Sequence, residues 1–216
     1  MKALVSRISR HLAVPAALLF TLASAVFATR IDDYSHVLHP VSLLGAMQMP
    51  SRWAFNLAAF IVPGVLVAGV ALRLRDRMSL LSADGRTLQF TARVGAQLWL
   101  ISALAFAVQG VVPLDMSDLD GVRSGRHAAA WMVWWIAFLA GGVAWTIGTR
   151  ANLRSRQLAR VSLWAALSLP VLALVLPRLL LPGLTQRLAF GLWFAWSIYA
   201  EVVLNRLPLN RTAASS

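Results

Sequence analysis

The sequence predicts an all-α membrane protein, a bundle of six transmembrane helices with a small extracytoplasmic cap. Of its 216 residues, 59% are hydrophobic and only 13% are charged, and the mean hydropathy is +0.69. A soluble domain of this length cannot bury so much apolar surface, so a lipid-facing exterior is expected. The apolar residues also fall into six runs, most of them close to the ~20 residues that a helix needs to cross a bilayer.

The six runs form one membrane domain that covers residues 1–216. We expect spans at about residues 12–28, 53–74, 94–112, 128–148, 161–181 and 187–204. No linker is long enough to separate two domains. Pro170 and Pro177 interrupt the fifth run and predict a kink in it, and Pro182-Gly183 predicts a tight turn before the sixth.

The first run has two interpretations. Lys2, Arg7 and Arg10 precede it, and it ends in small residues, which is also the pattern of a secretory signal peptide. The run is short for a span and contains Pro15. We expect an uncleaved first helix, with a cleaved signal peptide as the alternative, and the orientation of the remaining spans is the same in either case.

The distribution of charge predicts the orientation of the spans. With the N-terminus in the cytoplasm, 14 Lys and Arg residues lie inside and six lie outside, so the positive-inside rule places both termini in the cytoplasm. Most acids and histidines then face outward: Asp32, Asp33, Asp115, Asp118, Asp120, His36, His39 and His127. We therefore expect a multi-pass protein of the cell inner (cytoplasmic) membrane, with an outer cap made by residues 30–51 and 113–127.

Several classes of function are disfavoured by the sequence. The net charge is +12, but the arginines lie between apolar runs rather than in one basic patch, so we expect no nucleic-acid partner. The sequence contains no cysteine, so it can form neither a disulfide nor a metal site with thiolate ligands. The sequence carries no phosphate-binding loop, nucleophile elbow or dinucleotide fingerprint, and no histidine lies deep enough to hold a haem. We expect no cofactor.

The outer ends of three spans carry the polar residues that form the predicted binding site. Asn56, Gln109, Asp115 and His127 should lie near one another there. His127 opens the fourth span, where the helix dipole favours a neutral imidazole and helps to hold an anion. An Asp115–His127 pair would then handle protons or bind a headgroup. The alternative is a hydrogen-bonded connection that fixes the turn between spans three and four.

Trp131, Trp134 and Trp135 form, together with Phe138, an aromatic stripe on the outer half of the fourth span. The stripe suits the apolar part of a lipid or a flat ligand. Interfacial aromatics and ordinary helix packing explain it as well. Further along this span, Ala137 with Gly141 and Ala140 with Ala144 have the four-residue spacing of small residues that permits close helix contact.

Glu201 is the only acid inside a span, ~21 Å inward from Arg187 at ~1.5 Å per residue. An ionisable group at that depth is costly and is taken as functional by default. We expect Asn205 and an arginine from the inner loops as its partners. The alternative is a purely structural ion pair, or a carboxyl group that stays neutral.

A metal site in the cap is a further hypothesis. Asp32, Asp33, His36 and His39 would join Asp115 and His127 as oxygen and nitrogen ligands. Pro40 biases His39 away from helical geometry and weakens the His-x-x-His pair. The alternative is a solvated polar loop, and we assign no metal ligand.

Short motifs in the first two thirds of the chain resemble a known family. They are Ser42-Leu43-Leu44-Gly45-Ala46, Phe55-Asn56 with Gly64, Pro113-Leu114-Asp115 and His127. With them the chain resembles the domain of unknown function 998 family of prokaryotic multi-span membrane proteins, although that family often has glutamate at the position of Leu43. The resemblance implies an integral membrane protein with six spans and implies no activity.

The sequence thus favours a non-catalytic function: binding or passage of a lipid or small amphipathic molecule through an outer-facing polar vestibule. Asn56, Gln109, Asp115 and His127 would contact its polar end, and the three tryptophans its apolar part. One alternative is a membrane-embedded, metal-assisted hydrolase at the outer face. The other is a structural or assembly subunit of a membrane complex. Membrane lipids are the expected partners.

Overall fold

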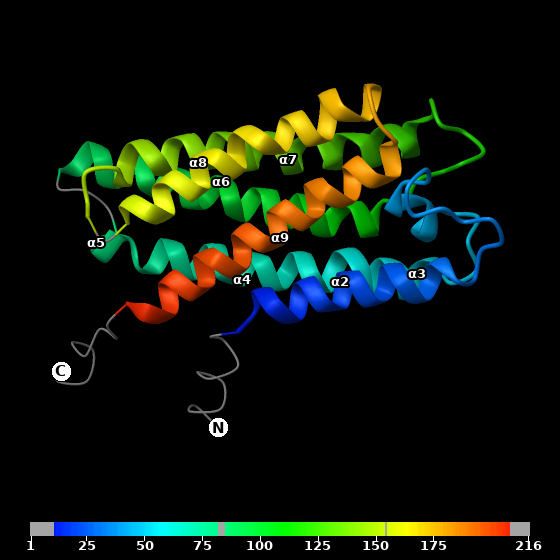
Figure 1. Cartoon of the computed structure of the whole chain (residues 1–216), viewed down its shortest axis with the longest axis horizontal. Coiled ribbons are helices and arrows are strands. Elements are labelled where there is room, and N and C mark those ends of the chain that lie inside the picture. Colours follow the sequence, from blue (N-terminus) through cyan, green and yellow to red (C-terminus); the bar gives the residue numbers. More distant parts are fainter. Residues whose placement is uncertain (1–10, 82–84, 154, 208–216) are drawn as a thin grey trace.

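The computed structural model describes residues 11–81, 85–153 and 155–207, and the regular secondary structure in these ranges is all helical. Six long helical segments lie side by side along one axis (Figure 1). In chain order they are α2 (Ala13–Ala28), α3–η2–α4 (Arg52–Asp76), α6 (Arg86–Val111), α7 (Val122–Thr149), α8–η3–η4 (Arg156–Arg178) and α9 (Pro182–Arg206). Five are long and apolar enough to cross a membrane, and α2 is a shorter apolar helix. The predicted all-α, multi-pass fold class is confirmed.

Several helices extend beyond the apolar runs that predict them. α6 and α7 begin at Arg86 and Val122, ahead of the expected starts at residues 94 and 128. Backbone groups near the hydrocarbon are best satisfied inside a helix, and arginine side chains at the interface can reach water. Each helix therefore extends into polar residues, which a span predicted from hydropathy leaves out.

Two of the long segments contain turns that are not α-helical. In the second, π-helical η2 (Leu57–Ile61) separates α3 (Arg52–Asn56) from α4 (Val62–Asp76). In the fifth, α8 (Arg156–Pro170) is followed by π-helical η3 (Val171–Val175) and 3₁₀-helical η4 (Leu176–Arg178). Proline lacks an N–H group and its ring clashes with the preceding turn. In the fifth segment the helix type changes directly after Pro170, and the kink expected there stays a prediction.

α6 and α7 form a hairpin whose backbones are in contact. A Cβ atom at Gly95 would lie 2.6 Å from the Trp145 nitrogen, and one at Gly141 would lie 2.7 Å from Cδ1 of Trp99. Of the predicted small-residue pairs, Ala137 and Gly141 are buried, whereas Ala140 is exposed. Glycine at this interface allows the close approach that stabilises helix pairs in lipid.

Aromatic rings fill the centre of the bundle. Phe106 of α6 stacks on Trp193 of α9, with ring centroids 4.7 Å apart, and lies 5.2 Å from Phe190. Phe20 brings α2 into the same cluster, at 5.2 Å from both Phe190 and Phe194. Each such pair contributes about 0.5–1.5 kcal/mol beyond burial. The first and last helices are thereby joined to the core.

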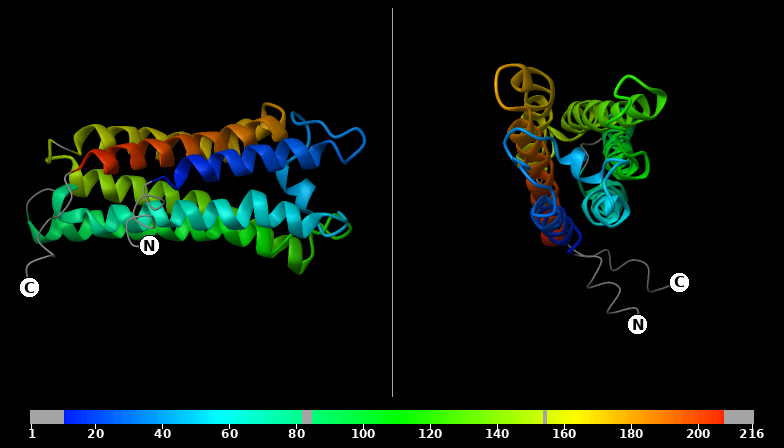
Figure 2. Two further views of the ribbon diagram at one scale, coloured as in Figure 1. Left: turned by 90° about the horizontal axis from the view of Figure 1, so that it is seen from below. Right: turned by 90° about the vertical axis from the view of Figure 1, so that its right-hand side faces the viewer.

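Two loops form a cap at one end of the bundle, residues 29–51 and 112–121 (Figure 2, left). They are hydrogen-bonded to each other through the Met47 N–H and the Leu114 carbonyl, at 2.8 Å. The first loop contains the short helix η1 (Val41–Gly45). It also accepts a hydrogen bond from the Leu184 N–H of α9 through the Val37 carbonyl, at 2.9 Å. The opposite end carries most of the described arginines and the short helix α5 (Met78–Leu81).

Candidate functional site

Asn56, the first predicted site residue, has a structural partner. Its amide donates a hydrogen bond to the Gly45 carbonyl at 2.9 Å, and the side chain is 2% exposed. A Cβ atom at Gly45 would collide with this amide. Asn56 thus fixes η1 of the cap on top of the second span.

His127 and Gln109 lie buried where α6 meets α7. Nδ1 of His127 is 2.9 Å from the Val112 carbonyl, just past the end of α6. The amide of Gln109 is 1% exposed, and neither its nitrogen nor its oxygen has a hydrogen-bond partner among the described residues. His127 therefore fixes the turn between the two helices, as the structural interpretation of this histidine predicts.

Asp115 lies on the surface of the cap, and its carboxylate has partners other than His127. It accepts hydrogen bonds from the Ser117 hydroxyl and from the Gln48 amide, both at 2.6 Å, and from the Ser117 N–H at 3.1 Å. The Ser117 and Gln48 hydrogen bonds lower the pKa of Asp115 below its usual value. The described structure shows no hydrogen bond between Asp115 and His127, so the predicted direct pair is wrong.

Sequence reasoning overlooked Ser124, which organises this turn. Its hydroxyl lies 2.8 Å from the Asp118 carbonyl and 3.0 Å from the Asp115 carbonyl, and the Asp115 N–H lies 3.3 Å from it. Serine in the first turn of a helix commonly pairs with nearby backbone groups. The sequence feature that could have indicated this role is the position of Ser124, three residues after Gly121 at the start of the helix.

The predicted tryptophan stripe packs against α9. Trp134 is fully buried, 5.1 Å from Phe190, and Trp131 lies 5.4 Å from the same ring. Trp135 is partly buried, and neither its indole N–H nor that of Trp134 has a partner among the described residues. A separate cavity of about 210 Å³ lies at the turn between α6 and α7, lined by Met47, Val111, Val112, Pro113, Arg123 and Arg126. None of the predicted site residues lines it.

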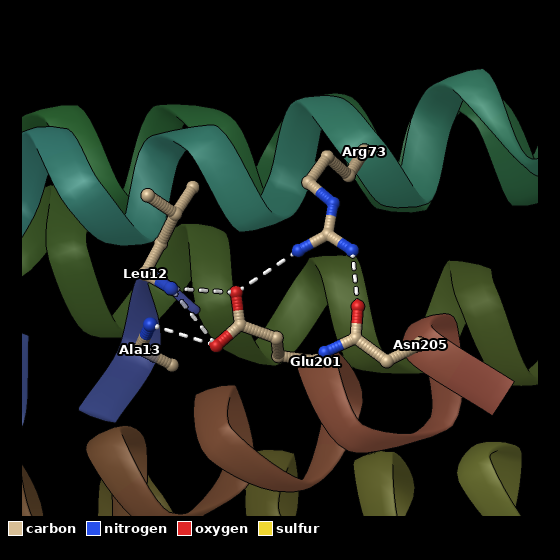
Figure 3. Close-up of polar contacts among 5 residues, drawn as sticks. All are labelled: Leu12, Ala13, Arg73, Glu201 and Asn205. Carbon is tan, nitrogen blue, oxygen red and sulfur yellow. Dashed lines mark hydrogen bonds and ion pairs between the residues drawn. The ribbon is translucent and has the colours of Figure 1, made fainter. Parts of the chain in front are cut away.

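Glu201 joins the last helix to the first (Figure 3). Its carboxylate, 3% exposed, accepts hydrogen bonds from the N–H groups of Leu12 and Ala13 at 2.8–3.0 Å. It also pairs with Arg73 at 3.0 Å, and Arg73 in turn donates to Asn205 at 2.6 Å. A carboxylate beside free N–H groups at a helix start is favourable. An arginine and Asn205 are thus both found in this network, as expected, although Asn205 contacts Arg73.

The histidines and acids of the cap do not converge on a metal centre. Among the described residues, no group of three or more His, Asp and Glu side chains could hold a metal ion. Nδ1 of His39 instead accepts a hydrogen bond from the Ser35 N–H at 3.0 Å.

A groove of about 430 Å³ lies between α2 and α9. These two helices lie together at one side of the bundle when it is viewed from the cap end (Figure 2, right). Apart from Ser24, His36 and Arg187, the residues that line the groove are small or apolar, with one further hydroxyl at Thr21: Ala17, Phe20, Thr21, Ala25, Gly191, Phe194, Ala195 and Ile198. A Cβ atom at Gly191 would meet no atom within 4 Å. Small residues thus leave space on the lipid-facing surface.

One end of this groove is polar. Arg187 of α9, His36 of the cap and Ser24 of α2 line it there. Ser24 is 7% exposed, and its hydroxyl has no hydrogen-bond partner among the described residues. The groove therefore has a polar mouth beside the cap and an apolar interior along the two helices.

The groove was not predicted from the sequence, although two of its residues were noted for other reasons. The sequence suggests His36 as a metal ligand and gives Arg187 no role in a site. The signal that was available is the four-residue spacing of Gly191 and Ala195, which marks a small-residue face on α9.

The comparisons with known proteins identify a family but no activity. Searches of curated proteins and of solved structures found no match. The sequence pattern of a protein family of unknown function, DUF998, matches residues 12–204, which takes in all six long helical segments almost entirely. The chain therefore belongs to the DUF998 family of proteins of unknown function.

Proposed function

We propose that this membrane protein binds an amphipathic lipid molecule in the groove between α2 and α9. The observation that carries the proposal is the distribution of polarity along the groove. The groove is polar at Ser24, His36 and Arg187, and the rest of its lining is apolar except for Thr21, whose hydroxyl donates to the Ala17 carbonyl. Ligand pockets typically combine an apolar lining with a few polar groups that fix orientation. The function agrees with the one that the sequence favours, but its site moves away from Asn56, Gln109, Asp115 and His127.

The packing of the two helices also supports an occupant that enters from the side. Thr21, Ala25, Gly191 and Ala195 are exposed on the surface that faces lipid. A lipid chain can therefore enter the groove from the bilayer without crossing the protein. Binding needs no opening of the aromatic core.

A groove-filling substitution tests the proposal. Ala25→Leu adds a bulky side chain to the groove, whereas Ala140→Leu makes the same change on the exposed face of α7, away from every cavity described above. Purified protein in lipid nanodiscs is labelled with a photoactivatable acyl-chain probe, and the labelled peptides are identified by mass spectrometry. We expect labelling of α2 and α9 in the native protein, about tenfold less in Ala25→Leu, and no change in Ala140→Leu. Equal labelling of all lipid-facing helices would contradict the proposal.

The leaflet from which the lipid enters depends on the predicted orientation. If both termini are cytoplasmic, the cap and the polar mouth face the outer leaflet of the inner membrane. Because the sequence has no cysteine, single-cysteine variants report topology directly. Leu119→Cys in the cap and Leu153→Cys at the opposite end are both highly exposed positions. We expect an impermeant maleimide to label intact cells only at position 119; labelling only at 153 would reverse the leaflet.

A further inference from the structure

Among the described residues, Arg187 at the mouth of the groove has only neutral partners. Its Nη1 donates to the carbonyls of His39 and Gly183, both at 2.9 Å, and its Nη2 donates to the Tyr34 hydroxyl at 2.7 Å. None of the ion pairs in the described parts of the chain includes it. A cation held near the hydrocarbon without a counter-charge is costly, and an anionic ligand would offset that cost.

The partners of Arg187 leave part of the guanidinium available. Arginine has five N–H donors, and three hydrogen bonds account for three of them. The two remaining donors lie on Nε and Nη2, which are bonded to the same carbon. Paired donors of this kind match the oxygens of phosphate.

The surroundings hold this arginine in place before any ligand arrives. The Tyr34 hydroxyl also lies 3.2 Å from the Pro40 carbonyl, and the Tyr34 ring lies 5.8 Å from the guanidinium carbon. The Val41 N–H donates to Gln186 of α9 at 2.6 Å, which fixes the cap loop against the same turn. Because the cation is already ordered, little conformational entropy is lost when a ligand binds.

Ser24 adds an unused donor one step deeper in the groove. Ser24 lines the cavity, and its hydroxyl, which is buried from solvent, has no hydrogen-bond partner among the described residues. A buried hydroxyl without a partner is uncommon in native proteins. After a change of its χ1 rotamer the hydroxyl would donate to the ester oxygen of a glycerolipid, and the acyl chain would then continue along the apolar part of the groove.

We propose that the groove selects an anionic phospholipid, with the phosphate on Arg187, the glycerol ester near Ser24 and one acyl chain between α2 and α9. This inference rests on the proposed function and specifies its ligand. Among bilayer lipids, a headgroup with net negative charge complements the unpaired arginine. A choline headgroup would bring a second cation to the same place.

The test compares two lipids of identical chains, phosphatidylglycerol and phosphatidylcholine, as competitors of the acyl-chain probe in nanodiscs. For the native protein we expect phosphatidylglycerol to compete about tenfold better. Arg187→Gln should remove this preference and keep the labelling of α2 and α9. The matched control, Arg178→Gln, removes an exposed arginine at the same end of the bundle and should keep the preference.

The variants separate failure of this inference from failure of the proposed function. If Arg187→Gln retains the preference while Ala25→Leu loses groove labelling, the phosphate assignment is wrong and the lipid groove stands. If α2 and α9 are not labelled in the native protein, both fail. Should Arg187→Gln not fold, Arg187→Lys keeps the charge without the paired donors, and an intermediate preference is expected. Equal competition by a free fatty acid would overturn the phospholipid assignment.

Discussion

The α6–α7 hairpin and the α2–α9 pair show two ways to join helices in lipid. In the hairpin, glycines allow contact along the backbones, as at Gly95 and Trp145. The α2–α9 pair is held by polar contacts at its ends, through Glu201 at one end and cap residues bonded to Gln186 and Arg187 at the other. Between the ends, the Phe20 ring packs against Phe190 and Phe194, and a groove remains beside these rings. Helix association in lipid depends on packing rather than on water exclusion. A gap beside these contacts can therefore persist as a site for lipid.

The largest predicted effect comes from removing the contact at the end of the α2–α9 pair that lies opposite the cap. Glu201→Ala leaves Arg73 and the first N–H groups of α2 without their carboxylate, which should cost about 3–5 kcal/mol of stability. Thermal unfolding in nanodiscs measures the loss. Asp76→Ala is the matched control, since its ion pair with Arg75 is exposed and long, at 3.5 Å, and should matter by less than about 1 kcal/mol. Equal effects of the two substitutions would show that Glu201 does not hold α2.

The second largest predicted effect is a difference in stability between glycine substitutions in the two helix pairs. Gly95→Leu must push α6 away from α7 and should destabilise the protein by about 1–3 kcal/mol. Gly191→Leu enters open space between α2 and α9 and should change stability by less than about 0.5 kcal/mol while abolishing acyl-probe labelling. Unfolding temperatures and probe labelling are measured on both variants. A large loss of stability in Gly191→Leu would mean that the groove is closed.

The smallest predicted effect is a pH dependence at the polar mouth. Burial, and then the charge of Arg187, lower the pKa of His36 below its ordinary value. A bound phosphate would favour the protonated imidazole and raise that pKa. Since the complex would then bind more protons than the free protein, phosphatidylglycerol should bind severalfold more tightly as the pH falls from about 7.5 to about 5.5.

His36→Gln tests this pH dependence, because the other groups around the mouth remain. These are Tyr34, whose ring lies 5.4 Å from the His36 ring, with His39 and Arg187. The affinity of this variant for phosphatidylglycerol should stay constant between about pH 7.5 and about pH 5.5. If His36→Gln keeps the pH dependence of the native protein, a group other than His36 takes up the proton.

Much of the fold follows from the sequence, because each helix is encoded locally. Apolar runs mark the spans, Pro170 marks the change of helix type in the fifth, and the depth of Glu201 in an apolar run requires partners. Gly141 likewise indicates a close helix contact.

The site could not be predicted in the same way, because it depends on which helices are neighbours. The groove joins Ser24 to Arg187, residues near opposite ends of the chain, and no local pattern places α2 beside α9. Asp115 and His127 are close in sequence and therefore look like a pair. In the structure His127 instead pairs with the Val112 carbonyl, and Asp115 pairs with Ser117 and Gln48.

A density map of the protein in nanodiscs that contain phosphatidylglycerol tests the central claim most directly. We predict elongated density between α2 and α9, starting at the Arg187 guanidinium and passing Ser24 toward Phe194. The Arg187→Gln variant should keep the chain density and lose the headgroup. Closure of the groove by contact of Thr21 or Ala25 of α2 with Gly191 or Ala195 of α9, with lipid density only around the outer surface of the bundle, would contradict the account.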